Sequence, residues 1–353
     1  MVVCAGSGGV GKTTMSAALG VRAAQLGRRT LVLTVDPAKR LASALGLDLK
    51  DDSDRAIPIP EASGSLSAAV IDSKKIFDRF VSTHSKQAEV VERIQRNRLY
   101  QQMSTTLAGS QEFTALERLL QSVESGTYDL VILDTPPTKH AMDFLTAPQR
   151  INSLFQDAVT KWFLPSGDKP KGFIASLVGR GTRTVLKSLE HLTGGPFIEE
   201  LIDFFGAVRS IQEVLRERSE RAHALLTSET TRFVVVTSFD AAKLLEAKYL
   251  QGQLKRLGYR FSAVIINRAF PLWLPHEVAS GDAQGIAVEK VRKFFDTFRE
   301  YYSTRYTLYE DFAKGLSGDV AVVRIPEYRQ DVHGLHDLTD LARALSAAGE
   351  SKP

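Results

Sequence analysis

The sequence predicts an α/β fold, a parallel and doubly wound sheet with an inserted α-helical subdomain. Short apolar, β-branched runs alternate with longer stretches whose apolar residues recur at helical spacing. Several of these runs end directly on a polar residue, at the edge where open parallel sheets bind ligands. From residue 146 to 228 no strand pattern occurs, and Gly and Pro separate amphipathic helices.

Composition limits the classes of function. The 353 residues are 43% hydrophobic and 24% charged, which allows one large core with an insertion. The net charge of +4 is too small to indicate a nucleic-acid partner by itself. A single cysteine, Cys4, excludes an internal disulfide and a thiolate cluster for zinc, and it indicates a reducing, cytoplasmic compartment. We expect neither a signal peptide nor a membrane span, since no apolar run approaches about 18 residues.

The first predicted strand, at residues 2–5, runs into the segment Gly6–Thr14, which reads Gly-Ser-Gly-Gly-Val-Gly-Lys-Thr-Thr. This segment fits the pattern G-x-x-x-x-G-K-S/T between a strand and a helix. The backbone N–H groups of such a loop point at phosphate oxygens, the lysine reaches the β- and γ-phosphates, and the next hydroxyl takes a Mg²⁺ position. We therefore predict a P-loop NTPase that binds ATP and Mg²⁺ through Gly8, Gly9, Val10, Gly11, Lys12, Thr13 and Thr14.

Two further apolar strands end on an aspartate. The strand at residues 30–35 ends on Asp36-Pro37, and the strand at 129–134 ends on Asp134, followed by Thr135-Pro136-Pro137-Thr138-Lys139-His140. The second arrangement is the Walker B pattern, in which the aspartate sits beside Mg²⁺ and the following loop senses the γ-phosphate. Asp36 has an alternative reading as a helix N-cap, and His140 one as an ordinary histidine.

The remaining elements complete the sheet and the insertion. We predict a surface loop around a short strand at residues 48–67, and helices from 71 to 125. The ATPase core then comprises residues 1–145 and 229–350, and the inserted helical subdomain residues 146–228, with which the 71–125 helices would pack. Within the insertion, the basic and apolar segment 169–187 fits a membrane surface or an apolar client, or else a solvated loop. Later strands are predicted at 232–237, 262–267 and 320–324, and helices at 241–257, 288–312 and 335–347.

Three motifs together carry a resemblance to a known family. The segment Gly6–Thr14 resembles the deviant Walker A loop of the arsenical-pump (ArsA) and tail-anchored-protein-targeting ATPases, which belong to the class of ParA and MinD. Thr34-Val-Asp-Pro-Ala38 is similar to the family's switch I, and Asp134–His140 to its switch II. Asn267 matches the residue that reads adenine, and Arg324-Ile-Pro326-Glu resembles the other wall of that pocket.

The resemblance implies ATP hydrolysis at a dimer interface, coupled to opening and closing of the dimer. By this resemblance Asp36 positions the attacking water and Asp134 supports the Mg²⁺ shell from its second sphere. Pro37, Thr135, Pro136 and His140 belong to the switches, and Asn267 and Pro326 hold the base.

The sequence departs from the family at one position of the loop. Where the family carries a signature lysine that crosses to the partner's nucleotide, this chain has Ser7. We expect a bacterial-type member in which hydrolysis is slow, another basic residue substitutes, or a lysine-bearing paralogue supplies the charge in a heterodimer instead of a homodimer. The Cys-x-x-Cys zinc clasp of the eukaryotic targeting factors is also missing, so no zinc is expected.

Several functions stay open at this stage. The first is a cytoplasmic ATP-driven switch for a hydrophobic client or a membrane protein, which could associate peripherally with the membrane. The second is a pump-driving subunit for an anion, and the third is a weakly active regulatory partner. A DNA-partitioning role is disfavoured, because the net charge is modest and the helical insertion is foreign to that branch.

Overall fold

The computed structural model describes residues 1–35, 40–46, 53–84, 91–92, 95–97, 100–101, 110–136, 141–147, 211, 213–269, 286–316, 318–328 and 331–350. The predictions made for Asp36, Pro37, His140 and the segment 169–187 lie outside these residues. The chain divides into two compact units. The first takes in Met1–Val70, Ser125–Ala141 and Thr227–Pro353, and the second Ile71–Glu124 and Met142–Leu226.

The first unit is built on one eight-stranded sheet in the order β3-β4-β2-β5-β1-β6-β7-β8. Its strands are β1 (Val2–Gly6), β2 (Arg29–Thr34), β3 (Arg55–Ile57), β4 (Ser65–Val70), β5 (Leu130–Asp134), β6 (Arg232–Ser238), β7 (Phe261–Ala269) and β8 (Ala321–Pro326). Every neighbouring pair is parallel except β3 and β4. The predicted α/β fold with a parallel sheet is confirmed, and β1 lies inside it between β5 and β6.

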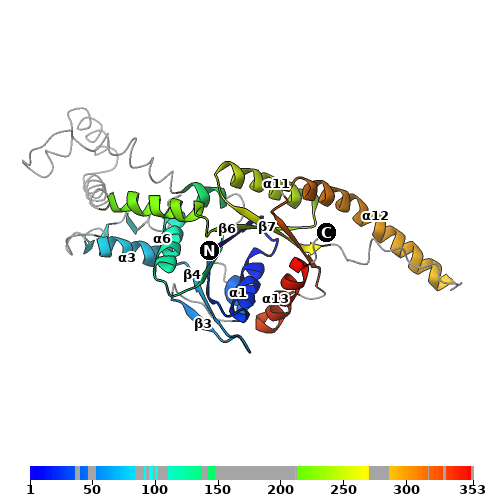
Figure 1. Ribbon diagram of the computed structural model, residues 1–353, viewed down its shortest axis with the longest axis horizontal. Helices are drawn as coiled ribbons and strands as arrows, with labels where there is room; N and C mark the ends of the chain where they lie inside the picture. Colours follow the sequence, from blue (N-terminus) through cyan, green and yellow to red (C-terminus); the bar gives the residue numbers. More distant parts are fainter. Residues whose placement is uncertain are drawn as a thin grey trace, which may run out of the picture. The chain divides into compact units, whose positions relative to one another are not determined.

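Helices cover both faces of this sheet. The helices α1 (Lys12–Gln25), α2 (Arg40–Leu45) and α13 (Gly334–Glu350) lie on one face, and α11 (Ala241–Arg256) and α12 (Ile286–Lys314) on the other (Figure 1). Close packing needs a glycine in α1, since a Cβ on Gly20 would lie 2.6 Å from Cγ2 of Val32 and 3.0 Å from Cδ1 of Leu66. The absence of this side chain lets α1 lie directly on β2 and β4.

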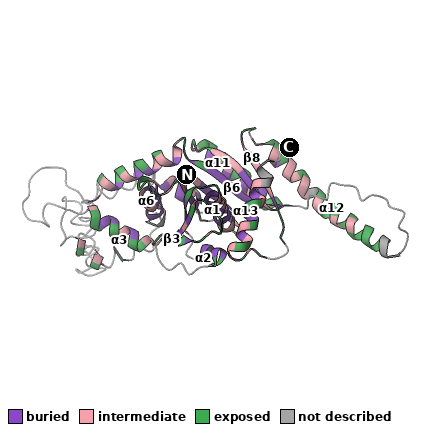
Figure 2. Ribbon diagram, turned by 60° about the horizontal axis from the view of Figure 1, so that its bottom comes forward, coloured by how far each residue is buried: buried purple, intermediate pink, exposed green. Residues whose placement is uncertain are grey.

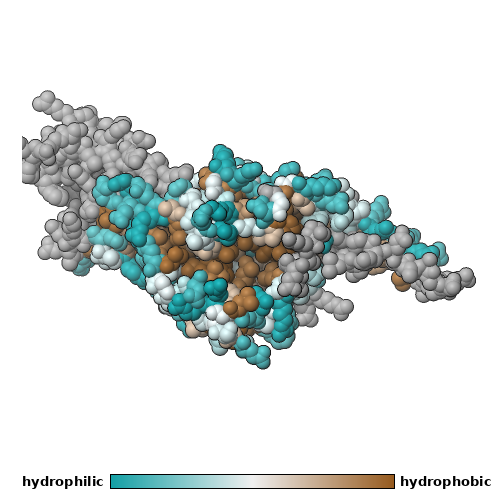
Figure 3. Space-filling view, viewed as in Figure 1, coloured by the Kyte–Doolittle hydropathy of each residue, from teal (hydrophilic) through white to brown (hydrophobic). Residues whose placement is uncertain are grey.

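The apolar runs predicted as strands form the core of the first unit. The inner residues of β1, β2, β5 and β6 are buried on both faces of the sheet, as expected for parallel strands covered by helices (Figure 2). On the face seen in Figure 3, apolar side chains gather in the middle, with hydrophilic side chains around them.

The prediction for residues 48–67, a surface loop around a short strand, is confirmed for the short strand β3 but misses β4, which begins at Ser65. Two strands lie there and just beyond, the antiparallel edge strand β3 and the parallel strand β4, which pairs with β2 from Arg29↔Ser65 to Thr34↔Val70. The sequence of β4 is Ser-Leu-Ser-Ala-Ala-Val, with few β-branched or aromatic residues. Burial of Leu66 and Ala68 in the core shared with α1 favours the strand against this weak propensity.

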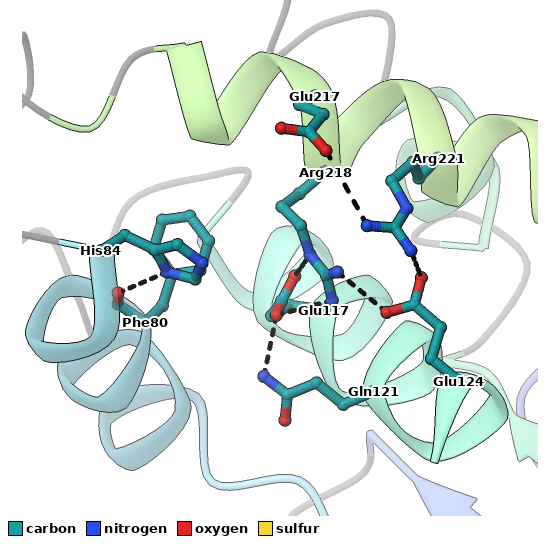
Figure 4. Close-up of polar contacts among 8 residues, drawn as sticks. All are labelled: Phe80, His84, Glu117, Gln121, Glu124, Glu217, Arg218 and Arg221. Carbon is teal, nitrogen blue, oxygen red and sulfur yellow. Dashed lines mark hydrogen bonds and ion pairs between the residues drawn. The ribbon is translucent and has the colours of Figure 1, made fainter. Parts of the chain in front are cut away.

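The second unit is helical in its described part, with α3 (Ser73–His84), α6 (Ser110–Glu124) and a helix through residues 213–227 that leads out of the unit. Phe77 stacks on Phe80 and on Tyr100, and Phe113 meets Phe77 and Phe80 edge to face, with ring centroids 5.1–6.5 Å apart. Figure 4 shows Arg218 between the carboxylates of Glu117 and Glu124. In the described residues, no helix combines the length and the apolar character that crossing a membrane requires.

Candidate nucleotide site

The segment between β1 and α1, residues 7–11, is here called the glycine loop. Close contacts require glycines at Gly6, just before the loop, and at Gly11, its last residue. A Cβ on Gly6, the last residue of β1, would lie 2.0 Å from the carbonyl oxygen of Val236 on β6. Gly11 precedes α1 in the left-handed conformation with φ 88°, and a Cβ there would lie 2.5 Å from Nδ2 of Asn267. No side chain caps the start of α1, so its N-terminus keeps the N–H groups that bind anions.

Lys12, the first residue of α1, bends back over the glycine loop. Its side chain is 7% exposed, and Nζ donates a hydrogen bond of 2.8 Å to the carbonyl oxygen of Ser7. The ammonium group is therefore held against the loop whose backbone is predicted to hold phosphates. An ammonium beside a curled backbone and a helix N-terminus adds to the positive potential of the loop.

Asp134 lies at the carboxyl end of β5 and is 1% exposed. One of its oxygens, Oδ2, accepts two hydroxyl hydrogen bonds, from Oγ1 of Thr13 at 2.6 Å and from Oγ1 of Thr34 at 2.9 Å. These three residues come from α1, β2 and β5, and the strand order places them at one edge of the sheet. The structure thus brings the predicted Mg²⁺ residues Thr13 and Asp134 into direct contact.

The chain that leaves β5 is fixed to β1. Both the backbone N–H and the hydroxyl of Thr135 donate to the carbonyl oxygen of Cys4, at 3.2 and 2.8 Å. Cys4 itself is fully buried, and burial raises the pKa of its thiol to about 12. The thiol therefore stays protonated near neutral pH and is a poor metal ligand.

Asn267 lies at the end of β7, where the loop and the late strands meet. Its Nδ2 donates to the carbonyl oxygen of Val10 at 2.9 Å, and its Oδ1 accepts from the backbone N–H of Arg268 at 3.0 Å. Pro326 ends the neighbouring strand β8 and pairs with Ala269. Both residues predicted to hold the base therefore lie on adjacent strand ends, and Asn267 contacts the glycine loop directly.

Two contacts at the site are absent from the sequence-based prediction. Ser7 is 2% exposed, and its hydroxyl donates to Oε2 of Glu246 on α11. Thr34 is the second donor to Asp134. The position of Thr34, a polar residue near the end of an apolar strand, could have indicated that it belongs to the site. Nothing in the sequence near Glu246 indicates that it contacts the glycine loop.

The residues present fit a magnesium ion bound together with phosphates. Mg²⁺ prefers oxygen ligands and usually keeps several waters, with one or two protein ligands and the substrate phosphates completing its shell. Thr13 would supply a hydroxyl oxygen, and Asp134 would hold that hydroxyl and the waters. The described residues contain no group of three or more His, Cys, Asp or Glu side chains that could hold a metal ion by themselves.

Comparison with known proteins decides the family. A family model described as anion-transporting ATPase matches residues 1–347. The chain belongs to the anion-transporting ATPase family. Among similar proteins, an ATPase get3 of Aspergillus terreus is 24% identical over 341 residues. The matched region covers 96% of this chain and 88% of the length of the get3 protein. An arsenical pump-driving ATPase of Aquifex aeolicus is 25% identical over 352 residues. The matched region covers 98% of this chain and 78% of the length of the Aquifex protein.

Membership confirms the resemblance that the sequence motifs carried, and it makes the chain an ATPase. In this member of the family, the described part of the chain brings Lys12, Thr13 and Asp134 together and sets Asn267 against the glycine loop. The roles assigned to single residues in binding, metal support and switching stay predictions.

Proposed function

We propose that this ATPase hydrolyses ATP with Mg²⁺ at the glycine loop, works as a dimer, and couples its nucleotide state to a protein client or a membrane partner. One observation carries the chemical part of the proposal. The loop lysine, the hydroxyl of Thr13 and the carboxylate of Asp134 converge at the carboxyl edge of the sheet. An ammonium, a hydroxyl and an acid at that edge are what phosphate and Mg²⁺ require.

In the proposed mechanism the protein positions charges and one water. Lys12 and the loop amides bind the β- and γ-phosphates. Thr13 and Asp134 would hold Mg²⁺, which would supply positive charge to the transferring phosphoryl group. Asp36 orients the water that attacks the γ-phosphorus. The bond between the γ-phosphorus and the bridging oxygen breaks, and ADP and phosphate leave. Thr135, held to β1, is the fixed point of the switch that continues through Pro136 to His140.

For the partner, we favour an apolar protein surface over an anion. The one cysteine of the chain is buried in β1, so a thiolate site for a metalloid has no support, although an oxyanion would need no thiolate. Val291, Phe294 and Tyr301 on α12 are exposed, which supports contact with an apolar client or membrane protein. A cytoplasmic location, with peripheral membrane association through such a partner, follows from the same proposal.

A second candidate function is a regulatory ATP-binding subunit with slow turnover. The contact between Ser7 and Glu246 favours it, because the loop position that carries a lysine elsewhere in the family is here short, buried and turned toward α11 of the same chain. Such a chain cannot supply a charge from this position to a partner's site. A charge of that kind is typically worth about 10³–10⁵ in rate.

Substitution of Lys12 tests the nucleotide site. Lys12→Ala should lower ATP affinity by about 10- to 100-fold, the factor expected for loss of a hydrogen bond to a charged group. Asp36→Asn should keep ATP binding and lose turnover. Binding is measured with a fluorescent ATP analogue and turnover by phosphate release, with and without a Mg²⁺ chelator. Lys248→Met, on the exposed face of α11, is the matched control and should change neither.

Each outcome decides between the candidates. Equal ATP affinity in the wild type and Lys12→Ala would overturn the site itself. Fast turnover of the purified chain that Asp36→Asn abolishes supports the active switch, whereas tight ATP binding with slow turnover supports the regulatory subunit. Light scattering with ATP and with ADP then tests the dimer, which should form or tighten with ATP.

A further inference from the structure

A row of contacts connects α11 to the lysine of the glycine loop. Nζ of Lys243 lies 3.1 Å from Oε1 of Glu246, whose Oε2 accepts the hydroxyl hydrogen bond of Ser7. The carbonyl oxygen of Ser7 accepts the hydrogen bond of Lys12 at 2.8 Å. The side chain of Ser7 thus contacts Glu246, and its backbone carbonyl contacts Lys12. A shift of the Glu246 carboxylate would therefore displace Ser7 and, through it, Lys12.

The helix that carries the carboxylate is firmly placed. Asp240 caps α11 by accepting from the backbone N–H groups of Ala242 and Lys243, at 3.0 and 3.3 Å. The hydroxyl of Thr237 on β6 donates to the carbonyl oxygen of Lys243 at 2.9 Å. The N-cap of α11 and its hydrogen bond to β6, the strand that pairs with β1, therefore position Glu246 beside the glycine loop.

Stability alone does not explain this arrangement. The side chains of Lys243 and Glu246 are 31% and 43% exposed and stand three residues apart on one helix, a geometry that contributes little to folding. The bond from the buried Ser7 hydroxyl is different, because it is charge-assisted. That bond, followed by the lysine, lowers the pKa of the Glu246 carboxyl, so the group stays ionised near neutral pH.

We propose that Glu246 is a positioning residue of the ATPase site. It holds Ser7 in place and thereby sets the carbonyl on which Lys12 rests, while Lys243 balances a negative charge that would otherwise repel phosphates. This inference rests on the proposed binding of ATP at the glycine loop. It also explains why position 7 tolerates a buried serine, since the hydroxyl is the anchor that joins the loop to α11.

A double-mutant cycle tests the proposal. Ser7→Ala and Glu246→Ala each remove the same bond, so each should lower kcat by about tenfold, the lower end of the factor for a hydrogen bond to a charged group, because the bond acts on Lys12 only through Ser7. The double variant should be no slower than the worse single one. Glu246→Gln keeps an acceptor oxygen and should lose less than Glu246→Ala. Lys243→Met should raise KM for ATP about two- to fivefold with little change in kcat, because it leaves the carboxylate unbalanced.

A second measurement is independent of activity. In nucleotide-free protein, amide hydrogen exchange of residues 7–12 should be faster in Ser7→Ala and Glu246→Ala than in the wild type or in the control Lys248→Met. The inference would be overturned if the double variant lost kcat by the product of the two single losses. It would also be overturned if Glu246→Ala left the hydrogen exchange of residues 7–12 unchanged. If the wild type binds no ATP, the proposed function fails, and the exchange measurement still decides whether Glu246 fixes the loop.

Discussion

At the scale of single residues, one oxygen atom organises the predicted metal side of the site. Oδ2 of Asp134 accepts the hydroxyls of Thr13 and Thr34, which reach it from a helix start and from a neighbouring strand. The two donors make the same kind of bond to the same atom, yet only Thr13 stands next to the loop lysine. Comparing variants of Thr13 and Thr34 can therefore distinguish a role in catalysis from a role in packing.

Thr13→Val and Thr34→Val should therefore differ. Each removes one hydrogen bond to a carboxylate, so each should lower the free energy of unfolding by about 1.5–3 kcal/mol. Only Thr13→Val removes a proposed Mg²⁺ ligand, and its turnover should fall about 100-fold or more while that of Thr34→Val falls less than tenfold. Urea unfolding and phosphate release over a Mg²⁺ titration measure both quantities. Equal losses of turnover would assign Thr13 a packing role alone.

The sequence predicted those site residues that lie inside a local pattern. Lys12 and Thr13 follow the glycines directly, and Asp134 closes an apolar strand, so their neighbours in the chain define them. The contact between Ser7 and Glu246 spans 239 positions and exists because β6, which leads into α11, pairs with β1. Strand order is a property of the whole sheet, and single-sequence patterns do not encode which helix falls beside which loop.

At the scale of elements, the described part of the second unit is joined by a buried ion-pair network. Arg218, on the helix through 213–227, donates to both oxygens of Glu117 at 2.8 and 2.9 Å and to Glu124 at 2.9 Å, both on α6. The side chain of Glu117 is 2% exposed and that of Arg218 11% exposed. Breaking such a pair leaves a buried charge without its partner, which costs far more than breaking an exposed pair.

Arg218→Met should destabilise the second unit by about 3–5 kcal/mol, because Glu117 stays buried without its cation. Arg216→Met is the control on the same helix. Its side chain is 48% exposed and pairs with Glu213 and Glu220, so its loss should cost about 0.5 kcal/mol or less. Denaturant unfolding with hydrogen exchange of the helical peptides measures both. Equal effects would contradict a buried network, and Glu117→Gln with Arg218→Met should recover part of the loss.

Elements with strong patterns were predictable, and β4 was not. The apolar runs of β1, β2, β5 and β6 have β-branched residues that favour strands whatever their surroundings. In β4, small residues carry no such preference, and the strand forms because Leu66 fits against Gly20 of α1. Tertiary packing therefore determines that β4 is a strand, which its local propensity does not predict.

At the scale of the whole molecule, the path of the chain relates the site to the second unit. The chain leaves the first unit after Val70, returns at Ser125 for β5 and the following residues, and leaves again after Ala141. The predicted switch that starts at Asp134 is thus bracketed in sequence by the two segments of the second unit. A change of conformation in this short return segment would act on both of them through the chain itself, as the proposed coupling between nucleotide state and a partner requires.

Turnover of mixed chains tests whether the site is completed by a second copy. A donor chain carrying Ser7→Lys and Asp36→Asn has the missing lysine but no hydrolysis of its own. Mixed in excess with the wild type, it should raise turnover per wild-type chain at least tenfold, a conservative threshold set below the rate factor of about 10³–10⁵ that is typical of a charge supplied in trans. The measurement is phosphate release against the ratio of the two chains, with Asp36→Asn alone as the matched donor.

The glutamate on α11 makes this experiment sharper. In the donor, Glu246 lies within reach of a lysine at position 7, and an ion pair within one chain would hold the ammonium away from the partner's nucleotide. A donor that also carries Glu246→Gln should therefore activate the wild type more strongly than the donor that keeps the carboxylate. Activation by neither donor would show that this ATPase takes no charge in trans from position 7, and a basic residue at another position would then have to substitute for the lysine or hydrolysis would stay slow.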